Sequence, residues 1–321
     1  MLKLLDATTI RDLTSVSDLA AVIGEAFVPA QDGSDGFVRS AVQTPGGQLL
    51  FMPAAHGATL SVKLVSLFDG ATAQGLPSVQ GLAVVFDAHS GRPLALMDAT
   101  ALTALRTAAV TTLATDLLAR RDARTLAVIG AGVQGRSHLE GLAGIRLWDS
   151  VRLHSRDMDK ARRLAEWARG VGIEVELHDS VESATEDADV ICTVTSAVAP
   201  LFTDAFRPRP GAHISAVGAY GPARRELPSR LVADASLFVE STEAVLREAG
   251  DILIPIAEGL LPPRPAMTEL SAVLSKEHPG RTSAEELTLF ESVGIPTEDA
   301  LVCDLLYRRA VQARAGRDIP F

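Results

Sequence analysis

The feature that most constrains the fold is the run TLAVIGAGVQGRSHLEGL at residues 125–142. An apolar strand segment is followed there by a glycine-rich turn and then by the start of a helix. From residue 122 onward, further strand segments alternate with helical segments as far as ASLFVES at 235–241. This alternation predicts an α/β domain with a Rossmann-type, doubly wound parallel sheet and helices on both faces.

The turn itself carries the pattern GxGxxG, formed by Gly130, Gly132 and Gly135. In that pattern the first glycine makes the tight turn, and the second lets the backbone approach a pyrophosphate. The third lets the helix pack closely on the strand, so that the helix N-terminus faces the phosphates. Because the motif stands between a strand and a helix, it predicts a dinucleotide-binding site rather than an accident of packing.

The next strand segment, SVRLHS, ends about 20 residues after the loop, where an acidic residue would accept the ribose 2′-hydroxyl of NAD. The chain instead reads His154-Ser155-Arg156 there. A hydroxyl and a guanidinium suit a 2′-phosphate, since arginine binds phosphate through two hydrogen bonds. The pattern therefore favours NADP(H), and Asp157, which follows directly, leaves NAD(H) possible.

The first third of the chain has a different pattern of apolar and polar residues. Residues 1–30 have apolar residues at helical spacing, and residues 36–98 contain short strand segments separated by glycine, proline and polar residues. This predicts a smaller α+β domain with a mainly antiparallel sheet. An apolar helix near 101–119, capped by Asp98 or Thr100, leads to a boundary near residue 120, and the chain is expected to end in a long helix.

Composition excludes several classes of function. The formal net charge of −10 argues against nucleic-acid and anionic-membrane partners, which need a basic surface. Two cysteines far apart in the chain suggest no disulfide framework, so a reducing cytoplasm is expected. No metal-ligand spacing, secretory signal or membrane-spanning run is apparent, and we expect no metal.

Three cations in or beside the first domain are candidates for a binding site. Arg106 lies on a helix that is apolar all round, so its guanidinium needs an anionic partner. That partner could be Asp98 or another acid in an internal salt bridge. Taken singly, Lys63 reads as an outward lysine on an edge strand and Arg39 as a solvated arginine. Taken together near a nicotinamide, the three would clamp a carboxylate.

The chain resembles the ornithine cyclodeaminase/μ-crystallin family over nearly its whole length, and most closely the branch of imine reductases. The matching stretches are Arg39 with MPA (52–54), SVKLVS (61–66), GLPSVQG (75–81), MDATALTALRTAA (97–109), AVIGAGVQG (127–135), ADVICTVT (188–195), PGAHISAVGA (210–219), REL (225–227), EAGD (248–251) and FESVG (290–294).

The resemblance implies a homodimer. Residues 1–119, completed by a final helix at 297–321, would bind the substrate and form the dimer contact, and residues 120–296 would form the Rossmann domain. Arg39, Lys63 and Arg106 would hold the substrate carboxylate, with Met52 lining the pocket. The residues that would contact the dinucleotide are Ser78, Thr107, Val133, Gln134, Arg156, Thr195, Val217 and Ser292.

The chain departs from the cyclodeaminase branch of this family at two positions. Tyr220 stands where that branch has an aspartate, and Leu50 stands where it tends to have a glutamate. Both changes remove acids that could accept a proton from a substrate amine. Tyr220 could donate a hydrogen bond or a proton, or could simply pack at a strand end. Glu226, in the shared REL motif, is interpreted as structural.

These observations lead to one expectation and three alternatives. We expect an NAD(P)H-dependent reductase of proline metabolism that converts Δ1-pyrroline-2-carboxylate to proline, Δ1-piperideine-2-carboxylate to pipecolate, or both. Lys63, Arg106 and Tyr220 are its expected catalytic residues. The alternatives are an ornithine cyclodeaminase, an alanine or opine-type amino-acid dehydrogenase, and a non-catalytic NADPH-dependent ligand-binding protein.

Overall fold

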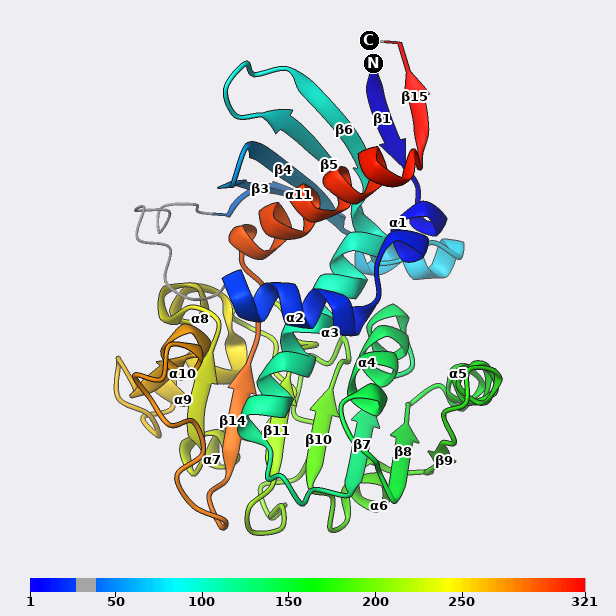
Figure 1. The fold of residues 1–321 in the computed structure, drawn as a ribbon. Helices are drawn as coiled ribbons and strands as arrows, with labels where there is room; N and C mark the ends of the chain where they lie inside the picture. The colour runs from blue at the N-terminus through cyan, green and yellow to red at the C-terminus, as the bar shows by residue number, and fades with distance from the viewer. Residues whose placement is uncertain (27–38, 321) are drawn as a thin grey trace. The chain divides into compact units, whose positions relative to one another are not determined.

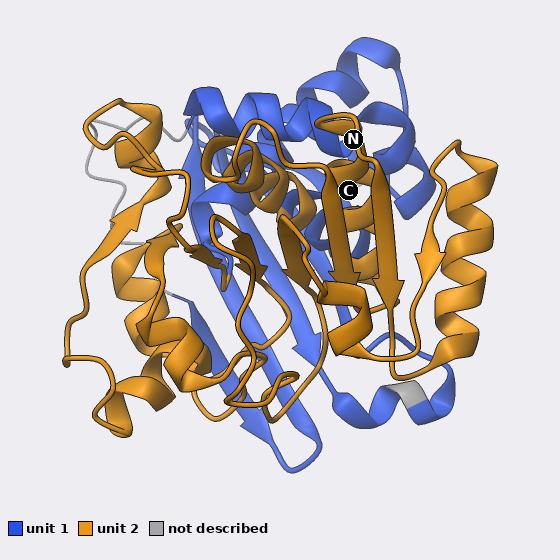
Figure 2. Ribbon diagram, turned by 90° about the horizontal axis from the view of Figure 1, so that it is seen from below, with its two compact units in different colours: residues 1–26, 30–106, 294–321 blue, residues 27–29, 107–293 orange. Residues whose placement is uncertain are grey.

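A computed structural model describes residues 1–26 and 39–320. The chain folds into two compact units, drawn in different colours in Figure 2. The described part of the first unit comprises residues 1–26, 39–106 and 294–320, and the second comprises residues 107–293. These divisions differ from the expected boundaries after residues 119 and 296, because the long helix near residue 100 contributes to both units.

The first unit contains a seven-stranded mixed sheet in the order β15-β1-β6-β5-β4-β3-β2. Strands β2 to β6 form an antiparallel meander, and β1 lies parallel to β6 and antiparallel to β15. The strands are β1 (Leu2–Leu5), β2 (Ser40–Thr44), β3 (Gly47–His56), β4 (Thr59–Leu67), β5 (Val79–Asp87), β6 (Pro93–Asp98) and β15 (Arg317–Ile319).

One long helix packs on the buried face of this sheet. It is α11 (Pro296–Ala313), which contacts β3, β4 and β5. The other helices of the unit are α1 (Ala7–Leu13), α2 (Val16–Ala26), the short 3-10 helix η1 (Asp69–Gln74) and the start of α3 (Ala99–Leu118). Asp98 caps α3, as expected for one of its two candidate caps, by accepting a hydrogen bond from Ala101 N at 2.9 Å.

The two ends of the chain correct the sequence analysis. Residues 2–5, expected to be helical, form β1, and the final helix does not continue to residue 321. Arg314 adopts a left-handed conformation that ends α11, and β15 then pairs with β1. Lys3 and Asp318 join these strands at 3.1 Å. Pairing between distant segments therefore outweighs local helical spacing; residues 27–30 of the expected helix lie outside the described residues.

The second unit contains eight parallel strands, in the order β13-β12-β14-β11-β10-β7-β8-β9. They are β7 (Thr125–Ile129), β8 (Ser150–His154), β9 (Glu176–Leu177), β10 (Val190–Thr193), β11 (His213–Ala216), β12 (Ser236–Val239), β13 (Met267–Glu269) and β14 (Thr288–Glu291). Figure 1 shows β14, β11, β10, β7 and β8 side by side.

Helices cover both faces of this parallel sheet. They are α4 (Val133–Gly144), α5 (Met158–Gly170), α6 (Val181–Thr185), α7 (Ser229–Ala233), α8 (Thr242–Glu248), α9 (Gly250–Ala257) and α10 (Leu270–Leu274), with the rest of α3. Alternate residues of β7 belong to different cores: Leu126 and Val128 to one, Ala127 and Ile129 to the other. The strands are thus buried on both sides, which confirms the predicted doubly wound α/β fold.

Among the described residues, no helix has both the length and the apolar character needed to cross a membrane.

Candidate active site

The glycine loop joins β7 to α4 and has the form of a phosphate cradle. A Cβ on Gly130 would lie 2.7 Å from the carbonyl oxygen of Val194, and one on Gly135 would lie 2.9 Å from the Gly130 carbonyl carbon. These two glycines are therefore required by packing. A Cβ on Gly132 would meet nothing within 4 Å, so its backbone faces open space. Gly132 is also the N-cap of α4 and provides no side-chain cap for the first N–H groups. The loop fits a bound pyrophosphate.

Other predicted dinucleotide contacts follow the strands beside this loop. In sheet order, Ser292 follows β14, Val217 follows β11, Thr195 follows β10, Val133 and Gln134 begin α4 after β7, and Ser155 and Arg156 follow β8. Because the strands are parallel, these residues share the carboxyl edge of the sheet. The chain leaves β7 first toward β8 and then returns to β10 on its other side, which makes β7 and β10 the switch point where such sheets bind ligands.

The residues after β8 bear on the choice of dinucleotide. Arg156 is exposed and Ser155 is half-buried. Asp157 is the N-cap of α5: one carboxylate oxygen accepts from Lys160 N at 3.1 Å, and the other lies 3.7 Å from Lys160 Nζ. The one acid that could serve a ribose 2′-hydroxyl is therefore used in capping its own helix.

Lys63 is buried in the first unit and does not lie on an edge strand. It is 1% exposed, and β4 lies between β3 and β5. Met52 pairs with it across the sheet and is also buried. Thr59 and Ser61 share the buried face of β4, whereas Leu60 on the opposite face is exposed. At these positions of β4 the usual pattern, with polar side chains outward and apolar ones inward, is reversed.

Arg106 and Lys63 converge on one carboxylate. Asp299 Oδ1 accepts from Arg106 Nε at 3.0 Å and from Lys63 Nζ at 2.8 Å, and Asp299 is fully buried. Arg106 Nη1 also donates to Glu298 Oε2 at 3.2 Å. The partner of Arg106 is thus another acid and not Asp98, which caps α3.

Arg39 joins this group through the backbone. Its Nη2 donates to the carbonyl oxygen of Gly294 at 2.7 Å. Gly294 has φ +69, and a Cβ there would lie 2.8 Å from Cζ of Arg106. Only glycine fits this position, for both its backbone conformation and its contact with the guanidinium. The three predicted cations therefore lie close together within the first unit.

Lys63, Arg106 and Arg39 lie together with Asp299 and Glu298, and this group of five is here called the cation cluster. The pKa of Lys63 is lowered to about 8, mainly by burial and also by the charge of Arg106, and Asp299 acts in the opposite direction. An added carboxylate would relieve this unfavourable burial of positive charge.

Sequence reasoning missed the two acids. Glu298 and Asp299 belong to the first turn of α11, where acidic residues are common because they interact favourably with the helix dipole. Glu298 also accepts from Ile295 N at 3.4 Å, as the third residue of a helix often does. The sequence predicts the helix but not the role of its first acids, and the need of Arg106 for an anionic partner is the only sign of that role.

The remaining predicted residues are placed as follows. Ser78 is half-buried just before β5, Thr107 is buried on α3, and Tyr220 is half-buried in the segment after β11. Gly221, next to Tyr220, pairs with Ala249. Leu50 is buried on the same face of β3 as Met52. Within the described chain, no cluster of histidine, cysteine or acidic side chains is arranged to hold a metal ion.

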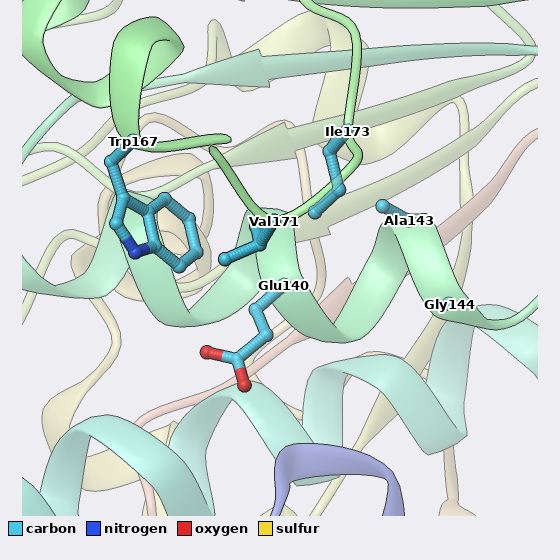
Figure 3. Close-up of a pocket in the computed structure, with 6 residues that line it drawn as sticks. All are labelled: Glu140, Ala143, Gly144, Trp167, Val171 and Ile173. Atoms are coloured by element: carbon cyan, nitrogen blue, oxygen red, sulfur yellow. The ribbon is translucent and has the colours of Figure 1, made fainter. Parts of the chain in front are cut away.

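The second unit also has a surface hollow of about 270 Å³ (Figure 3). Its lining consists of Glu140, Ala143, Gly144, Trp167, Val171 and Ile173. It therefore borders the carboxyl-terminal half of α4, and the glycine loop lies at the other end of that helix. None of the candidate residues lines it.

The ornithine cyclodeaminase/mu-crystallin family model matches residues 2–314. The chain belongs to this family. A Delta(1)-pyrroline-2-carboxylate reductase of Bacillus cereus is 36% identical over 276 residues, which cover 85% of this chain and 84% of that protein. The ketimine reductase mu-crystallin of Mus musculus is 36% identical over 312 residues, 94% of this chain and 96% of that protein.

A solved structure is similar over the same extent. Delta(1)-pyrroline-2-carboxylate reductase of Thermococcus litoralis, in complex with NADH and L-proline, matches with a TM-score of 0.93 and 34% identity. The match covers 99% of this chain and 100% of that one.

Removing the carboxylate of Asp299 is expected to destabilise the protein. Asp299→Asn leaves Lys63 and Arg106 buried with too little negative charge, at a cost of about 3 kcal/mol in the free energy of unfolding. Adding Lys63→Met to that variant removes one unpaired charge and should recover about 1 kcal/mol. Urea denaturation measures both changes.

The matched control is Asp318→Asn, which breaks the partly exposed pair with Lys3 and should cost less than about 0.5 kcal/mol. An Asp299→Asn protein as stable as this control would contradict the assigned role of Asp299.

Proposed function

We propose that this chain is an NAD(P)H-dependent reductase of cyclic ketimine carboxylates. Its substrate would be Δ1-pyrroline-2-carboxylate, giving proline, Δ1-piperideine-2-carboxylate, giving pipecolate, or both. The observation that carries the proposal is the cation cluster, in which Arg39, Lys63 and Arg106 come together and could hold one substrate carboxylate. The glycine loop, with open space at Gly132, supplies the place for the dinucleotide. The names of the three similar proteins support the same reaction class.

The bound nicotinamide would supply a hydride to the imine carbon. The protein's own part is to hold the substrate by its carboxylate through Arg39, Lys63 and Arg106. Asp299 fixes the positions of two of these cations, so little side-chain freedom is lost when the substrate binds. Met52, beside Lys63, would form an apolar wall against the ring.

The imine nitrogen must also gain a proton. Lys63 suits this role, since a pKa of about 8 leaves it largely protonated at neutral pH and still able to give the proton up. Tyr220 is a second candidate donor. Leu50 and Tyr220 stand where the resemblance puts acids in cyclodeaminases, and this favours the reducing direction over oxidation of an amine.

A homodimer is proposed from the reversed sheet face. Leu60 and Leu82 are exposed, and Val62, Leu64 and Val84 are half-buried beside them. These side chains are neighbours across β4 and β5, since Val62 pairs with Val84 and Leu64 with Leu82. A continuous apolar face of this kind is typical of a protein contact, and we assign it to a second copy of the chain. A monomer in sedimentation analysis at micromolar concentration would contradict this.

The function is tested by following NADPH and NADH oxidation at 340 nm with each cyclic imine, beside an ammonia assay on ornithine. We expect rapid oxidation with at least one imine and no ammonia. Ammonia released from ornithine without net cofactor change would instead identify a cyclodeaminase. Ligand binding without oxidation would identify a binding protein.

The pH dependence tests Lys63. If its protonated form serves the reaction, kcat/KM falls as the pH rises through about 8, where Lys63 loses its proton. Lys63→Arg keeps a positive charge to above pH 12, so this fall should disappear even if the variant is slower. A fall near pH 8 that persists in Lys63→Arg would belong to the substrate or another group.

Arg156 tests the choice of cofactor, for which we propose NADP(H). Arg156→Ala removes a cation suited to the 2′-phosphate, so KM for NADPH should rise about tenfold while KM for NADH stays within about twofold. Steady-state kinetics with both cofactors measure the difference, and Arg162→Ala, on the exposed side of α5, is the control. Equal effects on both cofactors would contradict the assignment.

A further inference from the structure

Glu226 lies buried at the carboxyl edge of the parallel sheet and is 0% exposed. Its side chain accepts four hydrogen bonds. Oε1 accepts from Thr195 N at 2.7 Å and from Thr195 Oγ1 at 2.6 Å. Oε2 accepts from Thr193 Oγ1 at 2.8 Å and from Gly218 N at 2.8 Å. The carboxylate is thus fully used as an acceptor.

These donors come from the ends of two neighbouring strands. Thr193 and Thr195 are at the end of β10, and Gly218 follows β11. Val194, between the two threonines, is the residue against which Gly130 of the glycine loop packs. One side chain therefore ties together β10 and β11 beside the switch point, next to the loop that would hold the pyrophosphate.

The backbone at Glu226 is itself held in place by a second buried acid. Asp251 accepts hydrogen bonds from Glu226 N at 3.1 Å and from Leu227 N at 2.8 Å. Burial raises the pKa of Glu226, and its hydrogen bonds from Thr195, Thr193 and Gly218 act in the opposite direction. Burial, with the charge of Glu226, raises the pKa of Asp251 to about 7. Two of the four donors to Glu226 are backbone N–H groups, which cannot accept in return.

We propose that Glu226 is a positioning residue for hydride transfer: by fixing the ends of β10 and β11, it sets the surface against which the nicotinamide end of the dinucleotide lies. This inference rests on the proposed reductase function. It goes beyond the structural role expected for the REL motif, because the strand ends that Glu226 fixes carry Thr195 and Val217, two of the predicted dinucleotide contacts.

Glu226→Gln is an informative change because it keeps the size of the side chain. Each oxygen of Glu226 faces one backbone N–H, so either orientation of the amide places its NH₂ group against a donor. One strand end must then move. Since hydride transfer depends steeply on distance, we expect kcat to fall about 10- to 100-fold. The primary isotope effect with 4-deuterated NADPH should rise, while the Kd for NADPH stays within about threefold.

Glu269→Gln is the control. Glu269 is a half-buried carboxylate at the end of β13 and accepts a hydrogen bond from Thr242 N at 2.7 Å. Strands β12 and β14 separate β13 from β11, so kcat and the isotope effect should stay unchanged. If Glu226→Gln does not fold, Thr193→Val can replace it, because this change removes a single hydrogen bond to Glu226 Oε2. It should lower kcat and raise the isotope effect in the same way, but by smaller amounts.

The emission of bound NADPH separates this inference from the proposed function. At saturating NADPH, Glu226→Gln should shift the emission maximum relative to wild type and to Glu269→Gln, whether or not any imine is reduced. If the wild-type protein reduces no imine but Glu226→Gln still shifts the emission, the proposed reductase function is refuted and the role of Glu226 in placing the dinucleotide is not. Unchanged emission, an unchanged isotope effect, or a wild type that binds no NADPH would overturn the role of Glu226.

Discussion

The buried ion group around Asp299 is the interaction on which the first unit depends. Two cations on different elements, Lys63 on β4 and Arg106 on α3, share a carboxylate from a third element, α11. Desolvating such charges costs several kcal/mol each unless they are paired, so the three elements can pack only in the arrangement that pairs them. The cations that must be paired for stability are also the ones proposed to bind the substrate carboxylate.

The second unit relies mainly on backbone groups rather than on buried ion pairs. Its glycine loop offers N–H groups and an open surface, and strand ends tied by Glu226 border that loop. Each of the two units contains a buried carboxylate that positions other groups, but the two carboxylates do so in different ways. Asp299 neutralises cations, whereas Glu226 collects hydrogen bonds from donors that carry no charge. In both cases the acid fixes groups that would otherwise have alternative positions.

Much of the second unit could be predicted from the sequence, because apolar strands alternating with helices allow few folds. The glycine loop and the strand-end residues follow directly from that order. The first unit was harder. In TLSVKLVSL the period of two separates Lys63 from Leu64 but does not say which face is buried, and the apolar face is the natural expectation. The structure buries Lys63 instead. Its counter-ion, Asp299, lies 236 residues away and looks like an ordinary acid at a helix start.

The sharing of Asp299 also limits how such an enzyme can diverge. Asp299 cannot change alone without leaving Lys63 and Arg106 buried with too little negative charge, so this position can be altered only together with its partners. Met52 and Leu50 carry no such constraint, because they are apolar neighbours on the same face of β3. In the proposed site, substrate range can therefore change through the size and shape of the apolar residues around Met52, while the cations that would hold the carboxylate stay unchanged.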